Sequence, residues 1–253
     1  MSENGHITTA IENGIGSITF FHPQSNSMPG DLLRTLAQEI TAMGKNPEAK
    51  VIVLRSQGEK SFCAGASFDE LISIKDLAAG EKFFSGFALV INAMRTAPKF
   101  VLARVQGKAV GGGVGLASAA DYTLAADGAS VKLSELAVGI GPFVVGPAVE
   151  RKIGTSAFTN LAINATEWRD ANWAKEKGLY ADVYPTIELL DEGVNALAKK
   201  LSTSNPEAMA ELKKIAWAGT EHWETLLFER AAISGRLVLS EFTVNAINSF
   251  KKK

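Results

Sequence analysis

The chain has 253 residues, of which 46% are hydrophobic and 21% are charged, so it holds enough apolar material for a sizeable core and lacks the composition of a disordered protein. Its 26 basic and 27 acidic residues nearly balance, which argues against wholesale binding to nucleic acid or to an anionic membrane. The length favours one main α/β domain with a helical tail.

Cysteine, histidine and hydropathy patterns exclude further classes of protein. The single cysteine, Cys63, cannot form an internal disulfide, and no charged segment followed by an apolar run stands at the N-terminus, so we expect a cytoplasmic protein. No stretch approaches the roughly 18 uninterrupted apolar residues of a membrane span, so none is expected. His6, His22 and His222 are scattered without a metal-binding spacing, and we expect no metal site.

The first third of the chain predicts a β-hairpin followed by a crossover. Apolar and polar residues alternate over 6–21 around Asn13-Gly14, a dipeptide suited to a tight hairpin turn. Apolar residues then recur at helical spacing over 32–43, behind Asp31 as the expected N-cap. A continuously apolar strand is expected at 51–54. Strand, helix and strand in this order predict a right-handed crossover onto a parallel sheet.

Two glycine-containing loops follow, each between a strand and a helix. The first runs from Ser56 to Ala66, before a helix expected at 68–74. A longer helix is predicted at 80–96, with an aromatic stripe that we interpret as core, and Pro98 ends it. A buried strand at 101–105 then runs into the second loop, Gly111-Gly112-Gly113, before a helix at 116–120.

The second half of the chain is mainly helical. Two short strands are expected from Tyr122 onward, and glycine and proline interrupt the pattern between Gly139 and Pro147. Helical periodicity returns at 189–201, 206–217 and 223–239, and the last three lysines, 251–253, are expected to form a solvated tail end. There is no internal repeat and no low-complexity linker.

The glycine turn does not match the common nucleotide-binding motifs. Leu116 breaks the G-x-G-x-x-G pattern at its last position, which disfavours a nicotinamide-dependent oxidoreductase. Gly107-Lys108 is followed by alanine, so the P-loop motif fails, and the G-x-S-x-G motif of serine hydrolases is absent. The turn can still present bare N–H groups at a helix N-terminus, where they stabilise an oxyanion, and Ala64-Gly65-Ala66 offers a second such turn.

Both turns carry a resemblance to one family. The stretch Ser61-Phe62-Cys63-Ala64-Gly65-Ala66 resembles the "F-C-A-G-A-D" turn of the enoyl-CoA hydratase/isomerase (crotonase) family. The segment from Val105 to Gly113 is similar to the family's "V-x-G-x-A-x-G-G-G" turn. Leu133 to Gly139 resembles the segment that carries a catalytic glutamate, and Ala174 to Leu179 resembles the later "A-x-x-x-G-L" segment. The similarity covers most of residues 6–190.

The resemblance implies a role for each matching residue. Ala66 and Gly112 would donate the N–H groups of an oxyanion hole to a thioester carbonyl, and Glu135 would be the catalytic acid–base group. Coenzyme A would contact Ala64, Ala66 and Phe68 as part of the substrate, with no separate cofactor. Its 3′-phosphate would meet Lys60 or a lysine of a neighbouring subunit.

The sequence departs from the family pattern at three positions, and the first two, Gly115 and Phe143, bear on the reaction. Hydratases of the family use two glutamates to activate water, but Gly115 stands at the position of the first. Phe143 puts a bulky apolar side chain where that water would lie, and Ser67 replaces an aspartate after Ala66. A single glutamate suffices to move a double bond, so we favour an enoyl-CoA isomerase. Hydratase, hydrolase or another lyase chemistry stays open, as does a non-catalytic acyl-CoA-binding homologue.

The resemblance also implies the architecture. It is an α/β fold, a crotonase-like ββα spiral over residues 1–190 that holds the active site. Residues 191–253 form a C-terminal helical region for oligomerisation, and a homotrimer or a hexamer made of two trimers is expected.

Overall fold

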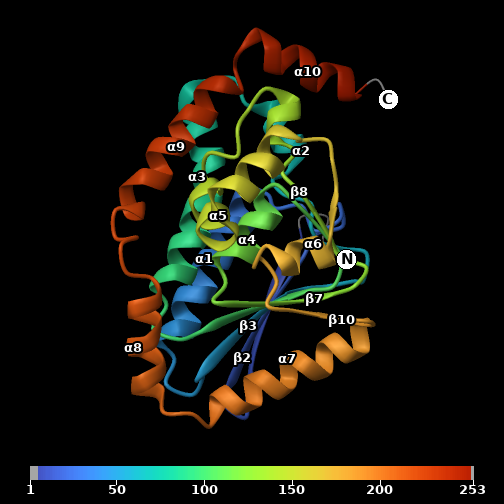
Figure 1. Ribbon diagram of the computed structural model, residues 1–253. Helices are drawn as coiled ribbons and strands as arrows, with labels where there is room; N and C mark the ends of the chain where they lie inside the picture. The colour runs from blue at the N-terminus through green and yellow to red at the C-terminus, as the bar shows by residue number, and fades with distance from the viewer. Residues whose placement is uncertain (1–4, 252–253) are drawn as a thin grey trace.

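The computed structural model describes residues 5–251, whose strands form two sheets (Figure 1). The larger sheet has the order β1-β2-β3-β5-β7-β10, in which β1 pairs antiparallel with β2 and the other neighbours pair in parallel. Its strands are β1 (His6–Glu12), β2 (Ile15–Phe21), β3 (Val51–Ser56), β5 (Val101–Val105), β7 (Tyr122–Ala126) and β10 (Asp182–Tyr184). The smaller sheet has the order β4-β6-β8-β9, formed by β4 (Ser61–Cys63), β6 (Lys108–Val110), β8 (Ser130–Lys132) and β9 (Arg169–Asp170).

The predicted hairpin and crossover are confirmed. Asn13 and Gly14 have φ values of 52° and 79°, as a two-residue hairpin turn of this type requires. Helix α1 (Gly30–Lys45) connects β2 to its parallel neighbour β3. The prediction that Asp31 caps this helix is wrong, because the N-cap is Pro29, two residues earlier, and Asp31 lies in the first turn. The Gly30 N–H is instead satisfied by the Glu70 carboxylate at 2.7 Å.

The larger sheet is covered on both faces, which explains why the first four residues of β3, Val51–Leu54, are all apolar. Ile52 and Leu54 pack toward the main core, together with α1 and α3 (Leu77–Thr96). Val51 and Val53 point to the opposite face and pack under α7 (Ile187–Ser202), which lies alone below the sheet in Figure 1. Burying each such aliphatic side chain contributes about 1.5–3 kcal/mol.

The helices that follow the two glycine-containing loops begin close to those loops. Helix α2 (Phe68–Ser73) is capped by the Ser67 hydroxyl, which accepts from the Glu70 N–H at 3.4 Å. Helix α4 (Gly112–Ala119) begins four residues before the predicted start at 116, because the glycines themselves form its first turn. Glu135 opens the short 3₁₀ helix η1 (Glu135–Val138), before α5 (Gly146–Ile163).

The C-terminal half is helical as predicted. It contains α6 (Ala171–Glu176), α7, α8 (Pro206–Ala216), α9 (Trp223–Leu237) and α10 (Glu241–Lys251). Helix α8 is held to the sheet by Lys213, whose ammonium donates to Asp121 at 2.9 Å. Among the described residues, no helix is long and apolar enough to cross a membrane. The expected lysine tail falls on Lys251, which ends α10, and on residues 252–253, which lie outside the described residues.

Helix α7 crosses the division expected between residues 190 and 191. Leu190 and Val194, one on each side of that point, pack in the same cluster against the sheet. Further along, Gly80 of α3 and Gly235 of α9 touch so closely that a Cβ on Gly80 would lie 2.7 Å from the Gly235 carbonyl oxygen. The close approach of α9 to α3 brings C-terminal residues next to the site described below, and the domain division itself stays a prediction.

Candidate active site

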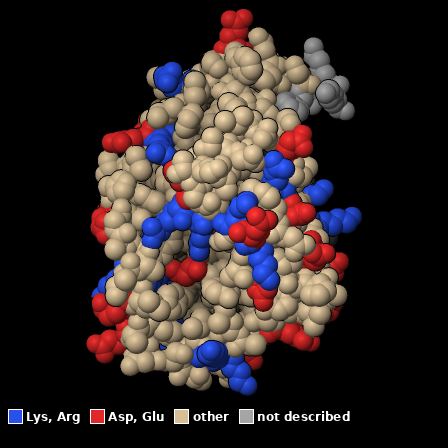
Figure 2. All heavy atoms as spheres, viewed as in Figure 1, with Lys and Arg blue, Asp and Glu red and all other residues tan. Residues whose placement is uncertain are grey.

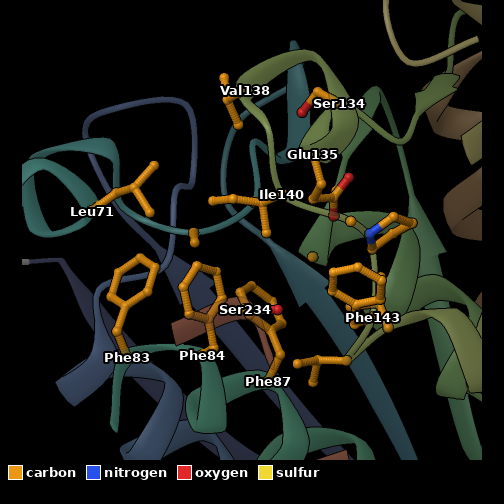
Figure 3. Close-up of a pocket in the computed structure, with 18 of the residues that line it drawn as sticks. Leu71, Phe83, Phe84, Phe87, Ser134, Glu135, Val138, Ile140, Phe143 and Ser234 are labelled. Atoms are coloured by element: carbon orange, nitrogen blue, oxygen red, sulfur yellow. The ribbon is translucent and has the colours of Figure 1, made fainter. Parts of the chain in front are cut away.

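A cavity of about 220 Å³ lies between the two glycine-containing turns, α3 and the loop around η1 (Figure 3). Every residue assigned to the site from the sequence lines this one cavity: Ala64, Ala66, Phe68, Gly112, Glu135 and Phe143. The fold brings these residues to one cavity although they come from segments up to 79 positions apart, and their roles stay predictions.

The two turns meet because β4 and β6 are parallel neighbours in the smaller sheet, so the chain leaves both strands at the same edge. Gly65 has a φ of 89° and Gly111 one of 52°, which favour glycine. A Cβ on Gly65 would lie 2.9 Å from the Val110 carbonyl oxygen and 3.6 Å from the Gly112 nitrogen. The backbones of the two turns therefore touch directly.

The N–H groups of Ala66 and Gly112 have no hydrogen-bond partner in the part of the chain that the structure describes, and the same is true of the Gly113 N–H in the first turn of α4. The Ser67 N–H, in contrast, donates to the Met28 carbonyl at 3.2 Å, and the Gly111 N–H donates to the Lys132 carbonyl at 2.8 Å. Two bare donors on the wall of one cavity can stabilise a negatively charged oxygen.

The loop after β2 fixes the first of these turns. Asn26 is buried with a positive φ of 56°, and its side-chain amide donates to the carbonyls of Gln57 and Ser61, both at 2.9 Å. The Ala64 N–H donates to the carbonyl of Ser25 at 3.2 Å. The turn is thus held from outside by a preformed loop, and its free N–H group does not need to reorganise to receive a ligand.

Glu135 presents its carboxyl group to the second turn. A Cβ on Gly111 would lie 2.9 Å from the Glu135 Oε1 atom, so only glycine allows this approach. The residue as a whole is partly exposed, but its Oε2 atom is buried and has no hydrogen-bond partner among the described groups. Desolvation of the charged form raises the pKa of Glu135 from its ordinary value of 4.5 to about 7. A carboxyl group of this pKa can both take and return a proton near neutral pH.

The surroundings of Glu135 are apolar. Among the described residues that line the cavity, it is the only one with an ionisable side chain. At Gly115, a Cβ would lie 2.5 Å from Val145 Cγ1, so the valine occupies the space that a longer side chain would need. The Phe143 ring lies over Gly141, where a Cβ would approach it to 2.4 Å. There is consequently no room for a second carboxyl group from position 115.

The sequence missed the part of the cavity that lies away from Glu135. The aromatic stripe of α3 was interpreted as core; its rings do pack in the protein, but Phe83, Phe84 and Phe87 also line the cavity. Ser234 of α9 reaches the same cavity, about one hundred residues after Glu135. The one available signal was that three phenylalanines follow the first turn on a single helix; nothing in the sequence indicated Ser234.

Lys60 lies outside this cavity, in a neighbouring hollow that shares Ala64 as a lining residue. Lys108 lines the same hollow, and the ammonium groups of Lys108 and Lys132 lie 5.3 Å and 4.5 Å from the centre of the Trp168 ring. Basic groups therefore adjoin the first turn. Over residues 5–251, no group of histidine, cysteine and acidic side chains is arranged to hold a metal ion.

Comparisons with known proteins agree with this geometry. Residues 10–236 match the family model described as enoyl-CoA hydratase/isomerase. Carnitinyl-CoA dehydratase of Escherichia coli strain K12 is 30% identical over 260 residues, covering 95% of this chain and 97% of the relative. The protein of that name from Salmonella enteritidis PT4 is 32% identical over 222 residues, covering 87% and 83%.

Solved structures share the fold. The crystal structure of an enoyl-CoA hydratase from Bacillus halodurans superposes with a TM-score of 0.88 at 22% identity, covering 96% of this chain and 99% of that one. One from Mycobacterium avium subsp. paratuberculosis K-10 has a TM-score of 0.84 at 24% identity, covering 97% and 95%. The expected crotonase-like α/β fold is therefore confirmed.

Proposed function

This chain belongs to the enoyl-CoA hydratase/isomerase family, and from that premise we propose that it moves the double bond of an enoyl-CoA thioester, with Glu135 as the acid–base group. One observation carries the choice of reaction: Glu135 is the only ionisable side chain among the described residues of the cavity wall. Double-bond migration needs one group that exchanges a proton, whereas hydration in this family needs two that hold water.

The N–H groups of Ala66 and Gly112 bind the thioester carbonyl oxygen. Removal of a proton from C2 leaves an electron pair that delocalises onto this oxygen, and the negative charge of the resulting dienolate collects there. Two fixed donors in a site without water stabilise that charge, and removal of one such donor typically costs about 3–4 kcal/mol of barrier. The lack of any competing acceptor for either amide supports this assignment.

Glu135 carries the proton between two carbons. Its carboxylate takes the proton from C2 of a 3-enoyl-CoA, and the C3–C4 electron pair becomes part of the dienolate. The carboxylic acid then returns the proton to C4, which leaves the double bond between C2 and C3 and restores the carboxylate. No oxidant, metal or water enters, so atoms and charge balance. A pKa near 7 suits both half-reactions.

Phe143 and Val145 exclude water from the same space. Phe143 lines the cavity beside Glu135, and Val145 closes the position from which a second glutamate would reach it (Figure 3). An apolar site keeps solvent from protonating the dienolate and strengthens the interaction with the oxyanion donors. The apolar wall therefore supports migration over addition of water.

Addition or removal of water is the second candidate, because the Escherichia coli and Salmonella relatives are named carnitinyl-CoA dehydratase. In that case a water molecule would have to be held by Glu135 and the backbone alone. The two candidates differ in product: a shifted double bond in one, and a 3-hydroxyacyl-CoA in the other.

The coenzyme A portion would leave the cavity past Ala64, Ala66 and Phe68. Phe68 is 38% exposed at the start of α2, where it can cover a bound pantetheine chain. Lys60 lines the adjoining hollow, and its ammonium group would bind the 3′-phosphate, because lysine side chains bind phosphate groups. We assign no cofactor beyond the substrate itself.

We also propose that the protein is a cytoplasmic homotrimer or a pair of trimers. In the view of Figure 2, charged side chains are sparse over the part of the surface just below α10. Leu136 beside Glu135 and Phe242 on α10 are 49% and 70% exposed, and Ile215 on α8 is 72% exposed, so apolar side chains are available for packing between subunits. Light scattering after gel filtration measures the assembly, and a monomer would refute it.

The function is tested with purified protein and a pair of substrates, a trans-3-enoyl-CoA and a trans-2-enoyl-CoA. We expect interconversion of the two, and a loss of at least about a hundredfold in kcat/KM on Glu135→Gln. Glu12→Gln on the exposed strand β1 is the matched control. A hydroxylated product from wild-type protein would favour the second candidate. Tight binding of acyl-CoA with no turnover of either substrate would favour a non-catalytic role.

A further inference from the structure

The cavity extends from Glu135 to an apolar end. In Figure 3, Glu135 and Phe143 lie at one side, and Leu71, Phe83 and Phe84 lie at the other. Val138 and Ile140 line the wall between these two ends. An acyl chain whose thioester lies at the two glycine-containing turns would therefore extend toward α2 and α3.

A second hollow, of about 300 Å³, begins where this apolar end stops. Of the described residues, Phe83 alone lines both the cavity and this hollow. The hollow is polar, since its lining includes Arg34, Glu70 and Lys82. The ring of Phe83 is 8% exposed and rests edge-on against Phe84 with 5.0 Å between centroids. One aromatic ring thus separates an apolar cavity from a charged surface hollow.

We propose that Phe83 sets the length of acyl chain that the site accepts, an inference that rests on the proposed acyl-CoA function. Each methylene that becomes buried raises affinity by about fourfold. The gain in affinity stops at the carbon of the acyl chain that meets the Phe83 ring. A longer chain must displace the ring and then enters the hollow beside Arg34, Glu70 and Lys82, where water and charge remove the benefit of burial.

The test measures binding of saturated acyl-CoA thioesters, which cannot isomerise, with even chain lengths from four to sixteen carbons. Dissociation constants come from calorimetry for wild-type protein, Phe83→Ala and Phe83→Leu. Phe228→Ala is the matched control, because Phe228 is a partly buried phenylalanine that packs against the core and lines neither the cavity nor the hollow. Thermal unfolding checks that each variant is folded, and Phe83→Leu provides a milder change if alanine destabilises the chain.

We expect the affinity of wild-type protein to rise as the acyl chain becomes longer and then to level off beyond one chain length. In Phe83→Ala the levelling should move at least two methylenes further, with about a tenfold gain for the longer chain, and Phe83→Leu should move it less. The Phe228→Ala profile should level off at the wild-type length. An unchanged profile in folded Phe83 variants, or an equal shift in Phe228→Ala, would overturn the proposal.

Failure of this inference is distinguishable from failure of the proposed function. If acyl-CoA binds with a length profile that depends on Phe83, the inference stands even when no isomerase activity is found. If no thioester of any length binds, both proposals fall. If isomerase activity is found but the length limit does not depend on Phe83, only the present inference is lost.

Discussion

Replacement of Glu135 by glutamine should change how stability depends on pH, independently of any substrate. Burial raises the pKa of this carboxyl group from 4.5 to about 7. The folded state therefore binds more protons than the unfolded state between these values. The free energy of unfolding of wild-type protein falls as pH rises through this window, because ionisation in the folded state is opposed by desolvation.

The size of the effect follows from the shift. At about 1.4 kcal/mol per pKa unit, a rise from 4.5 to about 7 corresponds to about 3 kcal/mol. Glutamine does not ionise, so the free energy of unfolding of Glu135→Gln should not fall with pH for this reason. Its amide also has to find partners beside an apolar wall, which adds a cost that does not depend on pH. The informative quantity is therefore the difference in free energy of unfolding between Glu135→Gln and wild-type protein, and in particular how this difference changes with pH.

Urea unfolding of wild-type protein, Glu135→Gln and the control Glu12→Gln at pH 5 and pH 8 measures this quantity. We expect Glu135→Gln to gain about 3 kcal/mol relative to wild type between the two values, and Glu12→Gln to follow wild type. In parallel, kcat/KM of wild-type protein should rise with pH through about 7, since the carboxylate is the base. A difference that stays constant with pH would show that the carboxyl group is solvated and would remove the physical basis of its catalytic role.

Three further outcomes are expected elsewhere in the chain. Gly115→Ala should lower the free energy of unfolding by about 1–3 kcal/mol in urea titrations, because its Cβ would meet Val145, and Val145→Ala in the same chain should relieve part of that loss. Lys213→Met should cost about 3 kcal/mol or more by the same assay, since it leaves the buried carboxylate of Asp121 without its ammonium partner. Burial raises the pKa of the Cys63 thiol to about 12, so a thiol reagent at pH 8 should label native protein at least about a hundredfold more slowly than protein unfolded in guanidinium.

Local features of the sequence predicted most of the elements. Alternation around Asn13-Gly14 predicted the hairpin, and a continuous apolar run from Val51 predicted the strand β3. These predictions held because side-chain periodicity and turn chemistry act over a few residues. Helix starts were less accurate: α1 began at Gly30 with no side-chain cap, since its N–H is satisfied by Glu70, forty residues away.

The sequence by itself determined which residues could carry the chemistry: two turns of small residues with free N–H groups, and a glutamate in a resembling segment. Only the tertiary structure decided what stands opposite them. The valine that fills the space beside Gly115, the ring that closes the acyl end at Phe83 and the contribution of Ser234 all depend on packing between elements distant in the chain. Such packing is set by the shapes of side chains on different helices and loops. Periodicity along one segment carries no information about these shapes, so the packing around Glu135 and the limit on chain length could be argued only after the fold was known.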